Sequence, residues 1–139
     1  MSFLQSHAAI SLALACVLWL VQLVIYPAFR FIDPHEFSRW HYRYTGAVTW
    51  VVAPLILLQA AGVVERFLFL QSPDLLWAIE CFNTVLAWTV TVTVSVPLHS
   101  QLQRARNEKT MRKLVVTNWV RTASWSATAA CSWIAASRA

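Results

Sequence analysis

Apolar residues along the chain gather into four long blocks that are separated by short polar stretches. The blocks span residues 8–29, 44–64, 75–98 and 114–137, and each reaches the ~20 residues that an α-helix needs to cross a lipid bilayer. Together they occupy most of the 139 residues. The pattern therefore predicts an all-α integral membrane four-helix bundle, with one transmembrane domain over residues 1–139.

The composition supports this class of protein. Hydrophobic residues make up 58% of the chain and charged residues 12%, against roughly 45–50% and ~25% in soluble domains. A soluble fold could not bury so much apolar surface. Residues 1–7 carry no Lys or Arg and the first apolar block is longer than the core of a secretory signal, so we expect a retained helix.

The basic residues predict how the helices are oriented. Two connections are basic: residues 30–43 hold Arg30, Arg39 and Arg43, and residues 104–113 hold five Lys or Arg, whereas the other connection holds Arg66 and the C-terminus Arg138. By the positive-inside rule the basic connections face the cytoplasm and both termini lie outside. In a bacterial inner membrane, which is the expected location, outside is the periplasm. The net charge of +5 then serves topology, and nucleic acid is not an expected partner.

The two halves of the chain echo each other. Tyr26-Pro27 stands near the end of the first block where Val96-Pro97 stands in the third, and residues 43–50 resemble residues 121–125. This echo predicts two hairpins related as a parallel repeat, about an axis along the membrane normal.

Polar residues inside the blocks follow helical spacing, so every predicted helix has a polar line facing the bundle. The strongest groups gather toward the cytoplasmic end, where we expect a pocket whose binding residues are Arg43, Asn118, Arg121 and Trp125. Arg121 lies about two turns inside the last helix, and no Asp or Glu of that leaflet lies as deep. A buried cation of this kind needs a partner. Either it binds an anion, such as a carboxylate, an enolate or a lipid phosphate, or it reaches up to the headgroups.

His41 and His99 are the candidate proton-transfer groups, with Tyr26 orienting the substrate. The two histidines stand near the cytoplasmic ends of their helices and could face one another. Such a pair suits acid–base chemistry or axial ligation of a haem iron, while interfacial histidines that serve only structure are the commoner case. We predict no other metal site, and no cofactor unless the histidines hold haem.

Two further features stand apart from this pocket. Glu80 is a carboxylate in the outer half of the third block, where a hydrogen bond from His7 or Ser11 would satisfy it; a proton relay is the alternative. Trp50 and Trp88 are among the tryptophans placed near mid-membrane, where indole rings could line a site for a flat quinone, porphyrin or polyketide.

Several of these residues also carry a resemblance to known proteins. Val96-Pro97-Leu98-His99 with Leu102, and Thr117-Asn118-Trp119 with Arg121, Thr122 and Trp125, resemble the VPLHxxL and TNWxRTxxW signatures of a group of bacterial four-helix membrane proteins, over nearly the whole chain. More distantly, the size, the four predicted helices and the Asn-Trp-x-Arg motif are similar to the anthrone-oxygenase-like family. That resemblance implies oxidation of an aromatic polyketide without a recognised metal or flavin.

The sequence therefore predicts a pocket, open to the cytoplasmic leaflet, for a lipid-soluble aromatic or anionic small molecule. The protein would be an oxidoreductase or an isomerase, either cofactor-free or dependent on haem. The alternative is a non-enzymatic subunit or assembly factor whose Ala- and Ser-rich last helix docks on a larger membrane complex. Membrane lipid is an expected partner in every case, and a homodimer is a further alternative.

Overall fold

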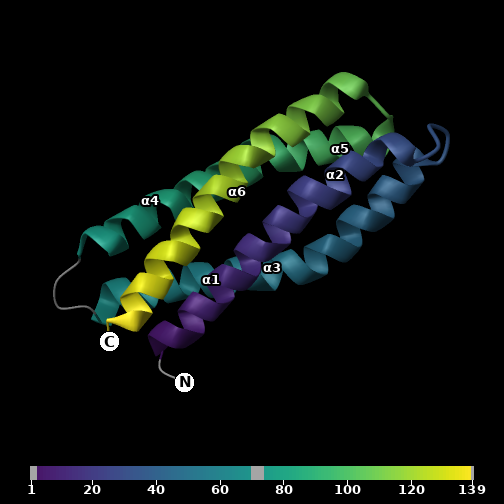
Figure 1. Ribbon diagram of the computed structural model, residues 1–139. Coiled ribbons are helices and arrows are strands. Elements are labelled where there is room, and N and C mark those ends of the chain that lie inside the picture. Colours follow the sequence, from purple (N-terminus) through teal and green to yellow (C-terminus); the bar gives the residue numbers. More distant parts are fainter. Residues whose placement is uncertain (1–2, 70–73, 139) are drawn as a thin grey trace.

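The computed structural model describes residues 3–69 and 74–138, and within them it contains helices and no strand (Figure 1). The first stretch runs through α1 (Phe3–Leu20), the π-turn η1 (Val21–Ile25), α2 (Tyr26–Ala28) and the 3-10 turn η2 (Phe29–Phe31). The second is α3 (Phe37–Phe69). The third comprises α4 (Leu75–Val90), the π-turn η3 (Thr91–Ser95) and α5 (Val96–Arg104), and the fourth is α6 (Glu108–Ser137).

Three of these stretches are long and apolar enough to cross a membrane: Phe3–Phe31, Phe37–Phe69 and Leu75–Arg104. This is what an integral membrane protein requires. Large apolar side chains also cover the outside of the bundle, as in Trp50, which is 86% exposed, and Phe82, which is 67% exposed. The stretch α6 has a similar length but carries many Ser, Thr and basic residues, and much of its polar surface lies inside the bundle.

Side chains at the connections set where the helices begin. Asp74 accepts a hydrogen bond from the Trp77 backbone N–H at 2.8 Å, and Asn107 accepts one from the Thr110 N–H at 3.0 Å. Both are N-caps, which satisfy backbone donors that the first turn leaves free. Ahead of α3, Asp33 caps a separate turn through the His35 N–H, and the helix itself begins at Phe37.

The helix α6 is the centre of the bundle, and it packs along both α1 and α4 (Figure 1). Small residues on its inner face let these helices approach closely, among them Ala129, Ser132 and Ala135, which are all buried. The Ala- and Ser-rich face, which in the alternative of a non-enzymatic subunit would dock on a larger complex, is therefore largely used within the chain. The helix α3 instead lies against α1 and α5, and has few contacts with α4.

Two apolar clusters hold the bundle together. One lies at the end that contains α2 and α5, and is built around Phe29, Phe37, Leu102 and Leu114, none of which is exposed. The other lies near the middle, where Trp125 packs among Leu14, Leu18, Ile56, Ala87 and Ala129. This middle cluster separates the polar groups at one end of the bundle from those at the other.

The two π-turns precede Pro27 and Pro97 in the same way. In each, the backbone N–H of the residue before the proline reaches back five residues, from Tyr26 to Val21 and from Val96 to Thr91. A proline lacks the donor that an α-helix needs and its ring crowds the preceding turn, so one extra residue per turn relieves the clash. The first and third helical stretches thus share a π-turn followed by a proline, at the positions where the two halves of the sequence resemble each other.

Candidate functional site

A groove of about 990 Å³ runs between α3 and the third helical stretch. Tyr26, Ser95 and Arg121 form its floor and are nearly or fully buried, while His99 is half-buried in its wall. Its rims carry exposed apolar residues, including Trp50 on α3 and Val92 on η3. The groove therefore opens sideways on the apolar outer surface of the bundle, and its floor is polar.

Arg121 is the charged group of this floor. Its side chain is 7% exposed, one guanidinium N–H donates to the Asn118 Oδ1 at 2.9 Å, and a longer contact of 3.5 Å reaches the Ser95 Oγ. The Tyr26 hydroxyl lies beside the same guanidinium. In residues 3–69 and 74–138, no carboxylate lies within ion-pair distance of Arg121, and its Nε–H has no acceptor. A buried cation with free donors and no counter-charge favours a bound anion.

Both π-turns help to hold Arg121 in place. Gln22, in η1, accepts a hydrogen bond from the Asn118 Nδ2 at 2.7 Å, and its own amide donates to the Val115 carbonyl at 3.3 Å. Asn118 is thereby oriented with its oxygen toward Arg121. Ser95, in η3, contacts the same terminal nitrogen of Arg121 as Asn118 does. Single π-turns inside α-helices occur often at functional sites. Here η3 places Ser95 against the guanidinium, and η1 places Gln22 against Asn118, which in turn accepts a hydrogen bond from Arg121.

His41 and His99 are in direct contact. The His41 Nε2 lies 3.0 Å from the His99 Nδ1, so one proton is shared between the two rings. His41 is fully buried and stacks on Phe37, with Phe29 packed against its edge. His99 lines the groove, and its second nitrogen is the one left to meet a ligand. His41 therefore orients His99, because a ring nitrogen that is engaged on one side fixes the role of the other.

The geometry of this pair does not fit the axial ligands of one haem. Such ligands must approach the iron from opposite faces of the porphyrin, with a nitrogen of each ring directed at the metal. Here the rings stack with centroids 5.2 Å apart and 21° between their planes, and they are bonded to each other. No porphyrin can lie between them. In the described part of the chain no group of three or more His, Cys, Asp or Glu side chains is placed to hold a metal ion.

The remaining predicted residues occupy different places. Arg43 lines the exposed rim of the groove, and Asn118 lies behind Arg121 rather than in the groove itself. Trp125, which we expected to contact the ligand, is fully buried in the middle apolar cluster and is not part of the lining. Gln103 was missed: its amide donates to the hydroxyl of Thr45, a residue of the inward polar line of the second helix, at 2.8 Å across the end of the groove.

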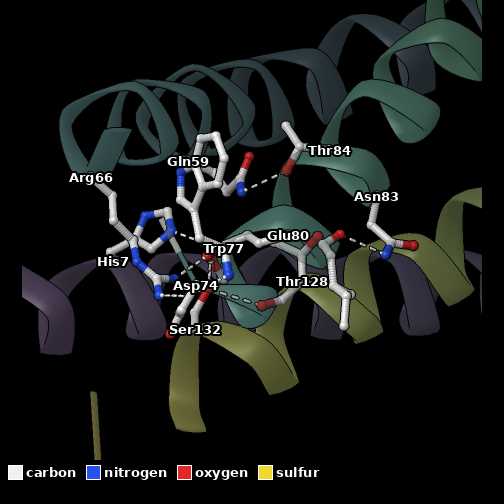
Figure 2. A network of polar contacts seen from close by, with 12 residues as sticks. His7, Gln59, Arg66, Asp74, Trp77, Glu80, Asn83, Thr84, Thr128 and Ser132 are labelled. Carbon is white, nitrogen blue, oxygen red and sulfur yellow. Dashed lines mark hydrogen bonds and ion pairs between the residues drawn. The ribbon is translucent and has the colours of Figure 1, made fainter. Parts of the chain in front are cut away.

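A second polar network lies at the other end of the bundle, around Glu80 (Figure 2). Glu80 is fully buried and accepts hydrogen bonds from His7 at 2.5 Å, Arg66 at 2.6 Å and Ser132 at 2.6 Å. These partners come from α1, α3 and α6, so the carboxylate on α4 ties all four helical stretches together. Arg66 also contacts Asp74, at 3.3 Å, whose side chain is 52% exposed.

Arg66 is the residue that sequence reasoning misplaced. We assigned it to a connection, but α3 continues to Phe69 and buries Arg66 to 4% exposure. The sequence did contain a signal that Arg66 faces the bundle, because it lies seven residues after Gln59 and residues seven apart share one helix face. Gln59 itself faces the bundle, where it donates to the Thr84 hydroxyl at 3.1 Å. Gly62 belongs to the same face and leaves room for the His7 ring.

No protein-family model matches the sequence, and neither a curated protein nor a solved structure is detectably similar to it.

Proposed function

We propose that all four helical stretches cross a bacterial inner membrane, with both termini on the periplasmic side. The helix α6 is as long as the others and lies between α1 and α4, so a bilayer that contains those helices also contains α6. Both termini lie at one end of the bundle, and the two basic connections lie at the other (Figure 1). E108C, in a variant without the native cysteines, is expected to react with an impermeant reagent after the inner membrane is opened and not before.

We propose that the groove binds a lipid-soluble molecule that carries an anionic or carbonyl oxygen. The observation that carries this proposal is Arg121: a nearly buried guanidinium, without a carboxylate partner in the described residues, on the floor of a groove that opens on the apolar surface. The oxygen of the ligand supplies the missing acceptor and charge. A flat aromatic molecule of the kind that the anthrone-oxygenase-like family oxidises belongs to this class, and Trp50 and Trp88 line the groove where its rings would lie.

The His41–His99 pair gives the same groove a group that moves protons. Arg121 stabilises a developing oxyanion such as an enolate, while His99 takes a proton from the neighbouring carbon and returns it, with His41 holding the ring. Removal of a proton at one carbon and its return at another is an isomerisation, and needs no cofactor. An oxidation begins with the same enolate but requires an electron acceptor in addition.

Native mass spectrometry of the protein released from its own membrane in mild detergent tests the binding proposal. The wild-type protein is expected to carry a small molecule that R121Q loses, because Gln keeps some hydrogen bonds but not the charge. R121K keeps the charge and should bind the molecule at reduced occupancy. R112Q, a charge change in the basic connection, is the matched control and should retain it fully. Equal amounts in wild type and R121Q would refute the proposal.

A further inference from the structure

The groove also indicates what kind of head group the ligand has. Resting on the function proposed above, we infer that the groove takes an amphiphile from the lipid phase whose head is a small oxygen group that only accepts hydrogen bonds. The carboxylate of a long-chain acid is the simplest example, and a phenolate or quinone oxygen shares its chemistry. Its head lies at Arg121 and its apolar part points toward Trp88 and Leu57.

The hydrogen-bond inventory of the floor selects an acceptor. A guanidinium has five N–H donors and no acceptor. In Arg121 the contacts to Asn118 and Ser95 both use one terminal nitrogen, and the Tyr26 hydroxyl lies beside the guanidinium. The Nε–H is buried without a partner among the described residues. An ammonium head would add a second positive charge to a site that has no described counter-charge, and would offer nothing to these donors. Amines are therefore excluded by charge and by hydrogen bonding together.

The depth of Arg121 selects a small head. It stands eight residues beyond Lys113, the last residue of the basic connection, which is about 12 Å along a helix at 1.5 Å per residue. A phospholipid keeps its phosphate among the headgroups, outside the hydrocarbon core. Its phosphate cannot reach Arg121 without drawing two acyl chains and a large polar head into the bilayer interior. A carboxylate or a ring oxygen needs only the donors that the groove provides.

The polarity along the groove sets the direction of the ligand. On one side of Arg121 the lining is polar, with Thr45, Ser100 and Gln103. On the other side it is apolar, with Ile56, Leu57 and Trp88. Both long walls end in exposed apolar residues, such as Trp50 and Val96. A molecule can therefore enter sideways from the hydrocarbon without passing through water, and its tail finds the apolar half.

Trp88 provides a direct test, because bromine atoms in contact with an indole quench its fluorescence. Protein in nanodiscs is titrated with a fatty acid brominated at mid-chain. We expect saturable quenching, of which W88F loses a large part while W133F, a change on the exposed apolar surface, does not. R121Q should raise the half-saturating concentration about ten- to a hundredfold, as expected for the loss of a charge-assisted hydrogen bond. R112Q should leave it unchanged.

Two further titrations decide between head groups. A brominated alkyl ammonium of the same chain length is expected to give partitioning without saturation, and saturable quenching by it would overturn the inference. Brominated phospholipid in the disc is expected to give no Arg121-dependent quenching at Trp88; if it does, the occupant is an ordinary lipid and the inference fails. If a molecule bound through Arg121 is found by native mass spectrometry but the fatty acid shows no saturation, the head-group inference alone is wrong. If neither is found, the proposed function fails as well.

Discussion

Asn118 presents its Oδ1 to the Arg121 guanidinium at 2.9 Å and is itself held by Gln22 at 2.7 Å. A neutral amide thus satisfies part of a buried cation whose charge no carboxylate of residues 3–69 and 74–138 compensates. The arrangement costs stability, because an ion in the interior of a bundle is expensive without an opposite charge. It also keeps the guanidinium ready for a ligand that supplies that charge.

The N118D variant separates these two effects. A carboxylate at this position gives Arg121 a charged partner, and Gln22 can turn its amide to donate to it, at the expense of the 3.3 Å hydrogen bond to the Val115 carbonyl. We expect the thermal unfolding temperature in detergent to stay the same or to rise, while the bound anionic molecule is lost. N118L, which removes the hydrogen bond without adding charge, should weaken binding about tenfold. An N118D protein that binds as well as the wild type would contradict the role of Arg121.

The histidine pair predicts proton exchange that can be measured before the substrate is known. If His99 takes a proton from the bound molecule and returns it, incubation in D2O should place deuterium on a carbon of that molecule, as detected by mass spectrometry after extraction. H99Q keeps a polar group in the groove and should retain the molecule but lose the label. H41F removes the partner of His99 and should slow labelling without releasing the molecule. Labelling that persists in H99Q would show that another group moves the proton.

The network around Glu80 predicts a large stability effect at one carboxylate and a small one at another. E80Q removes the charge that compensates buried Arg66, and should destabilise the bundle by about 3 kcal/mol, as for other broken buried ion pairs. D74N is the matched control, because Asp74 is 52% exposed and Asn is an equally good N-cap, so the loss should stay below about 1 kcal/mol. Thermal unfolding in one detergent compares the two. Equal shifts would mean that the buried contact contributes little.

The two glycines of α3 give a second matched pair. A Cβ at Gly62 would lie 2.1 Å from the His7 Nδ1, whereas a Cβ at Gly46 would meet nothing within 4 Å. G62A must push His7 away from Glu80, so the unfolding temperature should fall. G46A should be neutral or stabilising by up to about 1 kcal/mol, since Ala favours a helix over Gly. A G62A protein that is as stable as G46A would show that the His7–Glu80 hydrogen bond contributes nothing to stability.

Hydropathy predicted the four helices but made each of them too short at one or both ends. The apolar block in the second helix ends near residue 64, while α3 continues to Phe69, because the last turns are held by side-chain contacts that a hydropathy pattern does not contain. Arg66 was assigned to a connection for this reason. In a sequence, a charged residue inside a bundle cannot be told from one in a loop until its partner is known. The partner of Arg66 is Glu80, which lies 14 residues away on another helix.

The candidate site was predicted in part. Helical spacing identified Tyr26, His99 and Arg121 as inward-facing, and the structure places all three along one groove. The same spacing could not tell a residue that lines a groove from one buried in the core. Trp125 and Arg121 are four residues apart on one face of α6, yet Trp125 packs among apolar residues of α1 and α4. The groove lies where α3 and α4 are separated. The spacing between two helices cannot be predicted from the residue pattern within either one.

The central claim is that Arg121 recruits a molecule from the lipid phase into the groove, and site-specific photocrosslinking tests it most directly. A benzophenone side chain at Val92 faces the groove from its exposed rim, while one at Val116, which is exposed elsewhere on α6 and is not part of the lining, is the control. After irradiation in intact membranes, we predict a discrete small-molecule adduct at position 92, dependent on Arg121, and bulk-lipid adducts at position 116. The same lipid adducts at both positions, unchanged in R121Q, would contradict the claim.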